Sequence, residues 1–178
     1  EGKLGGLGVA CYVGTTAAMT QELGGIRFNA DGSVTIVTGT LDYGQGQWSA
    51  FSQVLTQKLG IPFDKIKLLQ GDSDQLVHGG GTGGSRSAML SGTAIVEASD
   101  KVIENGRQIA AQVLEASAGD IEFGNGRFVI AGTDRAIGIM ERAEKVRAGI
   151  KLPDGRDGTL DVTRVTEAVA RHRPNRGH

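Results

Sequence analysis

Two polar, glycine-rich stretches of this chain carry residue types that could bind a ligand. The first, TGTLDYGQGQ at 38–47, places Gln45 between two glycines just before a predicted helix. A side-chain amide donates and accepts hydrogen bonds, and a helix start offers backbone N–H groups without intrahelical partners. The stretch therefore suits a negatively charged ligand rich in oxygen and nitrogen. An alternative stays equally open: Gly44 and Gly46 supply a turn, and Gln45 faces solvent.

The second stretch, GGGTGGSRS at 79–87, brings hydroxyl groups and a guanidinium to another predicted helix start. Hydroxyls and N–H groups at a helix N-terminus form an anion site, and arginine adds bidentate recognition of phosphate. The alternative is that Ser85 caps the helix and Arg86 is a solvated charge. No Gly-Lys-Ser/Thr ends the stretch and the third glycine of a dinucleotide fingerprint is absent. It is therefore neither a P-loop nor a Rossmann motif.

Few other residues of the chain suggest chemistry. Asp72 and Asp74 could share a cation, but no further carboxylates lie nearby, so capping of a turn is favoured. His78 is the only histidine before the C-terminal tail, and one histidine builds neither a metal site nor a catalytic triad. Cys11 lies in an apolar run and is expected to be a small buried hydrophobe. We therefore nominate no catalytic and no metal-binding residue.

Composition narrows the function classes. The 178 residues carry a net charge of −1 and 4% aromatic residues, which argues against a nucleic-acid-binding surface. No apolar run approaches the ~20 residues that span a bilayer, and no signal peptide pattern opens the chain. A single cysteine cannot form an internal disulfide and fits a reducing compartment. We therefore predict a cytoplasmic protein without a transmembrane segment.

Hydrophobic periodicity and turn signals predict an α+β fold of β-hairpins packed with amphipathic helices, not a doubly wound parallel sheet. The turns Asp31-Gly32 and 124–126 mark two hairpins, and Gly60 and Pro62 end the first helix. Gly106 is a point at which the long second helix could bend or divide. The predicted strands are 5–15, 22–29, 33–40, 63–69, 120–123 and 127–131, and the predicted helices are 48–59, 87–116 and 138–148.

The order of several blocks resembles the molybdopterin-binding large subunit of the xanthine oxidase and aldehyde oxidase family, and is most similar to its bacterial aerobic carbon monoxide dehydrogenase branch. The blocks are GTLDYGQG at 39–46, Gln53, LGIP at 59–62, GDSD at 71–74 and GTGGSRS at 81–87. The resemblance implies that residues 1–166 form part of the molybdopterin cofactor-binding domain of this family. Residues 167–178 leave the pattern, and we expect this arginine-rich tail to be disordered.

The resemblance implies a segment of a molybdenum hydroxylase, which oxidises carbon monoxide, an aldehyde or an N-heterocycle with water as the oxygen source. The implied cofactor is molybdenum–molybdopterin cytosine dinucleotide, whose pyrophosphate fits the anion sites above. Iron–sulfur clusters and FAD would lie on partner subunits. The implied cofactor-binding residues are Gly44, Gln45, Gly46 and Gln47 in the first stretch, and Thr82, Gly83, Ser85, Arg86 and Ser87 in the second.

The chain departs from the family pattern in two respects. Gln47 stands where many relatives carry histidine, although glutamine can still form hydrogen bonds. The family's active-site loop and its glutamate general base have no match in these residues, and Cys11 does not match that loop. We therefore expect the chain to be inactive alone and to act with the remainder of the large subunit. The alternative is a stand-alone module that binds an anionic small molecule without a redox role.

Overall fold

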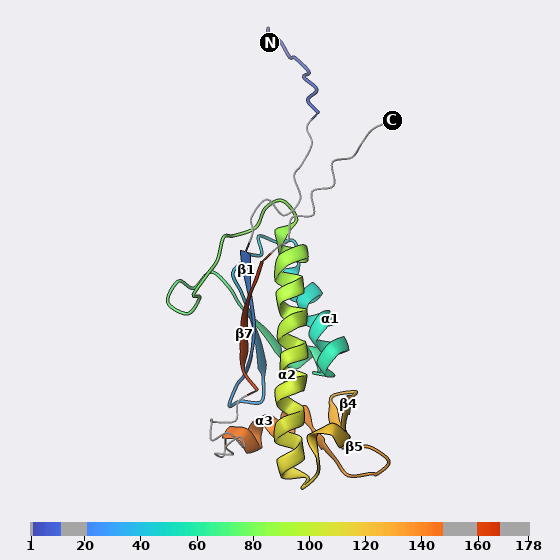
Figure 1. The fold of residues 1–178 in the computed structure, drawn as a ribbon. Coiled ribbons are helices and arrows are strands. Elements are labelled where there is room, and N and C mark those ends of the chain that lie inside the picture. Colours follow the sequence, from blue (N-terminus) through green and yellow to red (C-terminus); the bar gives the residue numbers. More distant parts are fainter. Residues whose placement is uncertain (1, 12–20, 148–159, 168–178) are drawn as a thin grey trace.

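Two β-sheets share one long helix in the computed structural model, which describes residues 2–11, 21–147 and 160–167. Helix α2 (Gly92–Val113) runs along the larger sheet and continues to the smaller one (Figure 1). Its buried stripe includes Ala94, Ala98, Val102 and Ile109, as the periodicity predicts. This helix therefore joins the two halves of the hydrophobic core, and the α+β prediction is confirmed.

The larger sheet has the strand order β3-β2-β1-β7. Strands β1 (Gln21–Phe28) and β2 (Val34–Thr38) form the first predicted hairpin, in the register that pairs Ile26 with Ile36. Strand β7 (Val162–Glu167) pairs antiparallel with the other edge of β1, and β3 (Ile66–Leu69) lies parallel to β2. The sheet is therefore mixed, and its two central strands are consecutive in the sequence.

Helix α1 (Gln47–Leu59) is the crossover that a parallel strand pair requires. Its apolar side chains Phe51, Leu55 and Leu59 are buried, and it ends at Gly60 in the left-handed conformation. The predicted strand 63–69 is shorter than expected, because a 3₁₀ turn (Phe63–Lys65) precedes β3. This arrangement places the start of α1 directly after the end of β2.

The predicted helix 87–116 divides at its beginning rather than at Gly106. A five-residue π-helix, Ser87–Ser91, precedes α2, and α2 then runs unbroken through Gly106. Gly106 is buried against the ring of Phe128, where a Cβ atom would overlap the ring. Glycine at this position therefore serves close packing and not a bend.

The smaller sheet has the order β4-β5-β6. Strands β4 (Ile121–Gly124) and β5 (Arg127–Ile130) form the second predicted hairpin, and both turn residues, Asn125 and Gly126, have positive φ angles. Strand β6 (Ala136–Gly138) extends this sheet and leads into α3 (Ile139–Arg147), which matches the predicted helix 138–148 over the described residues. The pattern did not predict β6 or β7.

The predicted strand at 5–15 is wrong over its described part. Residues 5–11 form no regular structure, and Leu7, Val9 and Cys11 are exposed. No described strand pairs with this segment, so it has no face to bury, and the expected burial of Cys11 is also wrong. Residues 12–15 lie outside the described residues, as does the predicted tail apart from Glu167, the last residue of β7. None of the described helices is both long and apolar enough to cross a membrane.

Candidate functional site

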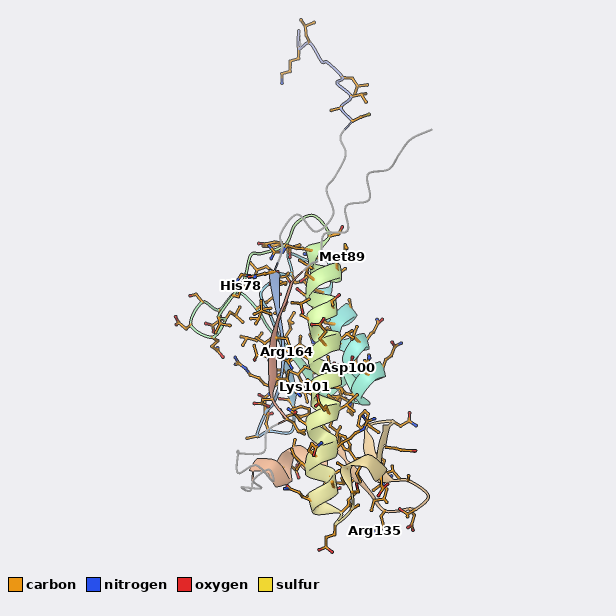
Figure 2. All side chains as sticks on the ribbon, viewed as in Figure 1. His78, Met89, Asp100, Lys101, Arg135 and Arg164 are labelled. Carbon is orange, nitrogen blue, oxygen red and sulfur yellow. The ribbon has the colours of Figure 1, made fainter. Side chains whose placement is uncertain are left out.

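The two glycine-rich stretches lie at one end of the molecule, where β2 ends and α1 and α2 begin. Figure 2 shows His78 and Met89 near this end and Arg135 at the opposite end. A pocket of about 290 Å³ lies between the stretches. Its lining includes Gly39 and Leu41 from the first stretch and Gly79 and Gly81 from the second, with Asp72 and His78 between them. Residues of both stretches therefore line one pocket, but its lining includes none of the nine predicted cofactor-binding residues.

Asp72 and Asp74 take part in a turn at the rim of this pocket. The Asp72 carboxylate accepts hydrogen bonds from the Asp74 N–H at 3.0 Å and from Gln75 Nε2 at 2.6 Å. The bond from Gln75 is the main reason why the pKa of Asp72 is lowered. Turn capping, the favoured interpretation, is confirmed. Within the described part of the chain, no group of three or more histidine, cysteine, aspartate or glutamate residues gathers as a metal site.

The backbone N–H groups of the first stretch are not free, contrary to the expectation. The Asp42 carboxylate accepts hydrogen bonds from Gly44 at 2.8 Å, Gly46 at 3.2 Å and Gln47 at 2.7 Å. Gly44 and Gly46 have φ angles of 107° and 77°, which glycine adopts without strain and which turn these N–H groups inward. These bonds, above all the one from Gly44, lower the pKa of Asp42. An internal carboxylate therefore occupies the anion-binding start of α1.

Gln45 is exposed, but its amide is also used within the stretch. Its Oε1 accepts a hydrogen bond from the Tyr43 N–H at 2.5 Å, and its Nε2 donates to the Leu41 carbonyl at 3.1 Å. A primary amide has two donor hydrogens and an acceptor oxygen with two lone pairs, so each end of Gln45 keeps capacity for a further bond. The side chain is thus held in place and still presents an amide to solvent.

Gln47 and Thr82 fasten the two stretches together. The buried Gln47 donates from Nε2 to Thr82 Oγ1 at 3.2 Å. The Thr82 hydroxyl also donates to the Leu41 carbonyl at 2.5 Å and lies 3.0 Å from the hydroxyl of Ser87. The structure therefore brings together three predicted site residues, Gln47, Thr82 and Ser87, as a connection between the stretches.

A buried network of hydroxyl groups, which the sequence interpretation missed, is hydrogen-bonded to Gln47 of this connection. Thr40 Oγ1 donates to Gln47 Oε1 at 3.2 Å, and Thr38, Thr40 and Ser91 share hydrogen bonds of 3.1 to 3.3 Å. All three are fully buried. The wide π-helical turn turns both Ser87 and Ser91 toward the interior. Threonines two apart at a strand end share one face, and that spacing was an available signal for the network.

Arg86 is not a solvated charge, because its side chain is only 3% exposed. Its Nη2 forms an ion pair with Glu22 Oε2 at 2.7 Å and donates to the Gln21 carbonyl at 3.0 Å. Its Nη1 donates to the Gly80 carbonyl at 3.1 Å. The terminal nitrogens of the predicted phosphate-binding fork are therefore engaged within the chain. Glu22, on β1, is a second residue that the sequence interpretation missed.

Gly83 and Ser85 stay apart from these connections and are exposed. Ser85 has a φ angle of 59°, an uncommon conformation for a residue with a side chain. Its carbonyl accepts a bond from the Met89 N–H at 3.2 Å, and its hydroxyl makes no hydrogen bond to the described residues. Of the predicted contacts in the second stretch, these two are the most accessible to a ligand.

The residues present fit a phosphate-bearing organic cofactor of the kind that the resemblance implies. Gly81 in the pocket lining leaves its side-chain position nearly open, so a ligand could approach the backbone closely there, whereas the missing side chains of Gly39 and Gly79 let the two stretches pack against each other. Arg86 Nε is buried and has no hydrogen-bond partner among the described residues, so a ligand oxygen could satisfy it. The exposed Ser85 hydroxyl and Gln45 amide add neutral hydrogen-bonding groups in the same two stretches.

Comparison with known proteins finds relatives that are parts of dehydrogenases. The chain is 32% identical over 143 residues to the 6-hydroxypseudooxynicotine dehydrogenase complex subunit gamma of Paenarthrobacter nicotinovorans, covering 80% of this chain and 18% of that protein. It is 38% identical to the carbon monoxide dehydrogenase large chain of Afipia carboxidovorans, covering 65% of this chain and 14% of that protein. The chain thus spans less than a fifth of the length of either relative.

Solved structures and family profiles give the same result. The fold matches reconstituted carbon monoxide dehydrogenase from Oligotropha carboxidovorans with a TM-score of 0.76 and 30% identity, over 85% of this chain and 18% of that one. The profile described as the molybdopterin cofactor-binding domain matches residues 1–173. The resemblance inferred from the glycine-rich blocks is confirmed, and the chain belongs to the molybdopterin cofactor-binding domain family.

Proposed function

We propose that this chain forms part of the cofactor site in the large subunit of a molybdenum hydroxylase. The observation that carries the proposal is the joining of the two glycine-rich stretches, through Gln47 and Thr82, beside a pocket of about 290 Å³. Neither stretch would define a ligand position alone. Together they form a hydrogen-bonded unit with exposed amide and hydroxyl groups.

The predicted site residues divide into two roles under this proposal. Gln45, Gly83 and Ser85 are exposed and would contact the cofactor directly. The others would set the shape of the cradle: Gly44 and Gly46 through their backbone conformation, and Gln47, Thr82 and Ser87 through the connection between stretches. Arg86 would contribute through Nε, the guanidinium nitrogen without a partner among the described residues.

We propose molybdopterin cytosine dinucleotide as the organic part of the cofactor. Its pyrophosphate would lie against the second stretch, where the Ser85 hydroxyl and Arg86 Nε are unsatisfied by described residues. The similarity to a carbon monoxide dehydrogenase large chain supports this form. When bound, the molybdenum centre supplies two-electron oxidation of the substrate with an oxygen atom that comes from water. The residues of this chain hold and orient that group.

The whole protein would oxidise carbon monoxide, an aldehyde or an N-heterocycle and pass electrons to iron–sulfur and FAD subunits in the cytoplasm. The name of one relative assigns it to a dehydrogenase complex, which supports partner subunits. This chain alone would be inactive, because the resemblance assigns the active-site loop and the general base to other parts of the large subunit. Turnover by this chain alone with an artificial electron acceptor would contradict that proposal.

The proposal is tested on the complete parent complex. Molybdenum content and the fluorescence of the oxidised pterin are measured in the wild type and in Gln45→Ala, with Gln108→Ala as the control. Gln108 is an exposed glutamine on α2, away from the pocket. We expect stoichiometric metal and a cytosine nucleotide in the wild type and the control, and lower occupancy in Gln45→Ala. A folded, fully assembled complex without metal or pterin would favour the anion-binding module instead.

A further inference from the structure

We propose that Glu22 is a positioning residue that holds Arg86, and with it the wall of the cofactor pocket. This inference rests on the proposed function. Glu22 lies on β1, is fully buried, and belongs to neither glycine-rich stretch. Its carboxylate contacts no ligand under the proposal, so it would act on the cofactor through other residues.

One oxygen of the Glu22 carboxylate accepts a hydrogen bond, and the other lies in the ion pair with Arg86 without a hydrogen bond of its own among the described residues. Oε1 accepts a hydrogen bond from the Leu23 N–H at 2.9 Å, which fixes the carboxylate against its own strand. Oε2 lies 2.7 Å from Arg86 Nη2. Because both side chains are at most 3% exposed, water does not screen this pair. Charge neutralisation inside the protein therefore depends on these two residues.

Two glycines show that the pair lies directly behind the pocket wall. A Cβ atom on Gly39 would overlap Glu22 Oε1, and a Cβ atom on Gly80 would overlap the Arg86 guanidinium. Gly39 itself lines the pocket, and Gly80 lies between Gly79 and Gly81, which both line it. Each member of the ion pair therefore packs against one of the two stretches.

The same contacts determine which atom of Arg86 remains available. Glu22 and the Gln21 carbonyl engage Nη2, and the Gly80 carbonyl engages Nη1. Nε is left as the guanidinium nitrogen without a partner among the described residues. Without the Glu22 charge the Arg86 guanidinium loses its ion-pair partner and can rotate toward other acceptors. The Nε–H direction and the Gly80 position would then change together.

The test uses the parent complex loaded with cofactor. The rate of cofactor dissociation is followed by pterin fluorescence for the wild type, Glu22→Gln and the matched control Glu104→Gln. Glu104 is an exposed glutamate on α2 that bonds Lys101. Glutamine keeps the size of Glu22 and an acceptor for the Leu23 N–H but removes the charge. We expect cofactor loss about tenfold to a hundredfold faster in Glu22→Gln, the range for partners that orient a ligand-binding group, and no change in the control.

A second variant keeps the inference testable if Glu22→Gln does not assemble. Arg86→Lys retains a cation that can pair with Glu22 but has no atom equivalent to Nε and cannot hold two carbonyls in one plane. We expect a folded complex that also loses cofactor faster. A folded Glu22→Gln or Arg86→Lys complex that releases cofactor at the wild-type rate would overturn the inference, even if its melting temperature were lower. A wild-type complex without pterin would instead contradict the proposed function.

Discussion

Two buried arginines at opposite ends of the molecule differ in the partners of their guanidinium groups. Arg86, at the pocket end, has a carboxylate and two carbonyl oxygens as partners. Arg142, on α3 at the other end, is fully buried, and none of its three side-chain nitrogens has a hydrogen-bond partner among the described residues. Its guanidinium carbon lies 5.1 Å from the centre of the Phe128 ring. Burial lowers the pKa of Arg142 to about 10.

The two ends of the protein therefore differ in their interior: the pocket end is held by hydrogen bonds and an ion pair, and the end around Arg142 is held by apolar packing. At the pocket end, a buried carboxylate pairs with Arg86, and amide and hydroxyl groups separately bond one another in a connected set. Arg142 lies over Phe128, a member of the apolar core that also contains Ile121, Ile137 and Ile139. A cation over an aromatic ring recovers part of the cost of burial, but a desolvated charge without hydrogen bonds remains costly. The connected polar set, not burial of charge alone, marks the functional end.

Arg86→Met should have the largest effect, because it leaves the Glu22 carboxylate buried without its ion partner. We expect the free energy of unfolding to fall by about 3–5 kcal/mol, the range for breaking a buried pair by removing one member. Urea denaturation followed by circular dichroism measures this. A loss below about 1 kcal/mol, the size typical of an exposed pair, would show that water reaches Glu22 in the folded protein.

Arg142→Met should have the opposite sign. The variant removes a buried charge that has no hydrogen-bond partner among the described residues and replaces it with an apolar side chain that favours helix. We expect the free energy of unfolding to rise by about 1–3 kcal/mol. The same denaturation series measures both arginine variants. Destabilisation by Arg142→Met would mean that the contact with Phe128 outweighs the desolvation of the guanidinium.

The increase in unfolding free energy expected for Arg142→Met should also depend on pH. Burial lowers the pKa of Arg142 to about 10 in the folded protein, below that of the free side chain, so the unfolded chain binds this proton more tightly. The free-energy penalty for charged Arg142 is therefore complete below pH 10 and is relieved as the pH rises from 10 toward the higher pKa of the unfolded chain. The difference in unfolding free energy between variant and wild type should shrink above pH 10. A constant difference would argue against burial as the cause.

Local sequence patterns predicted the elements whose signals lie within one segment. Helix α1 and both hairpins follow from periodicity and turn residues. Strand β7 escaped prediction because it pairs with β1, which is distant in the sequence. The expected strand at 5–15 failed over residues 5–11 for the converse reason: an apolar pattern forms a strand only where another strand accepts it.

Prediction of the site was limited in the same way, because local sequence patterns do not show contacts between distant segments. The sequence pointed to both glycine-rich stretches, which the fold brings together, but it could not show which donors were already used. Asp42 was read as part of a loop, and it occupies the backbone N–H groups assigned to a ligand. Glu22 fits an ordinary strand pattern, and only the fold brings it to Arg86. Such pairs depend on tertiary contacts, which periodicity does not encode.

Asp42→Asn should have a moderate effect at the pocket end. The charged carboxylate accepts hydrogen bonds from three backbone N–H groups, and a neutral amide accepts them more weakly. We expect a melting temperature lower by a few degrees at pH 7. Asp134→Asn, at an exposed position beside the smaller sheet, is the matched control and should change little.

The pH dependence of that variant follows from the lowered pKa of Asp42. A carboxyl group whose pKa is lower in the folded than in the unfolded protein stabilises the fold above its ordinary pKa of 3.8. This contribution is lost as the pH falls through the folded-state value. Wild type and Asp42→Asn should therefore differ in melting temperature at pH 7 and converge below pH 3.8. A difference that persists under acid conditions would indicate that the geometry of the stretch, not the charge, supports α1.

Lys58→Met should have the smallest effect, and it completes the comparison of the two arginines. Lys58 Nζ lies 2.9 Å from Asp100 Oδ1, a distance close to that of the pair formed by Arg86, but its side chain is 40% exposed and that of Asp100 is 58% exposed. In water the attraction is weak, and salt at 0.1 M screens it over about 10 Å. We expect a change in unfolding free energy below about 1 kcal/mol, which decreases further as salt is added. If Lys58→Met cost as much as Arg86→Met, ion-pair distance rather than burial would determine stability, and the contrast between the two ends would lose its physical basis.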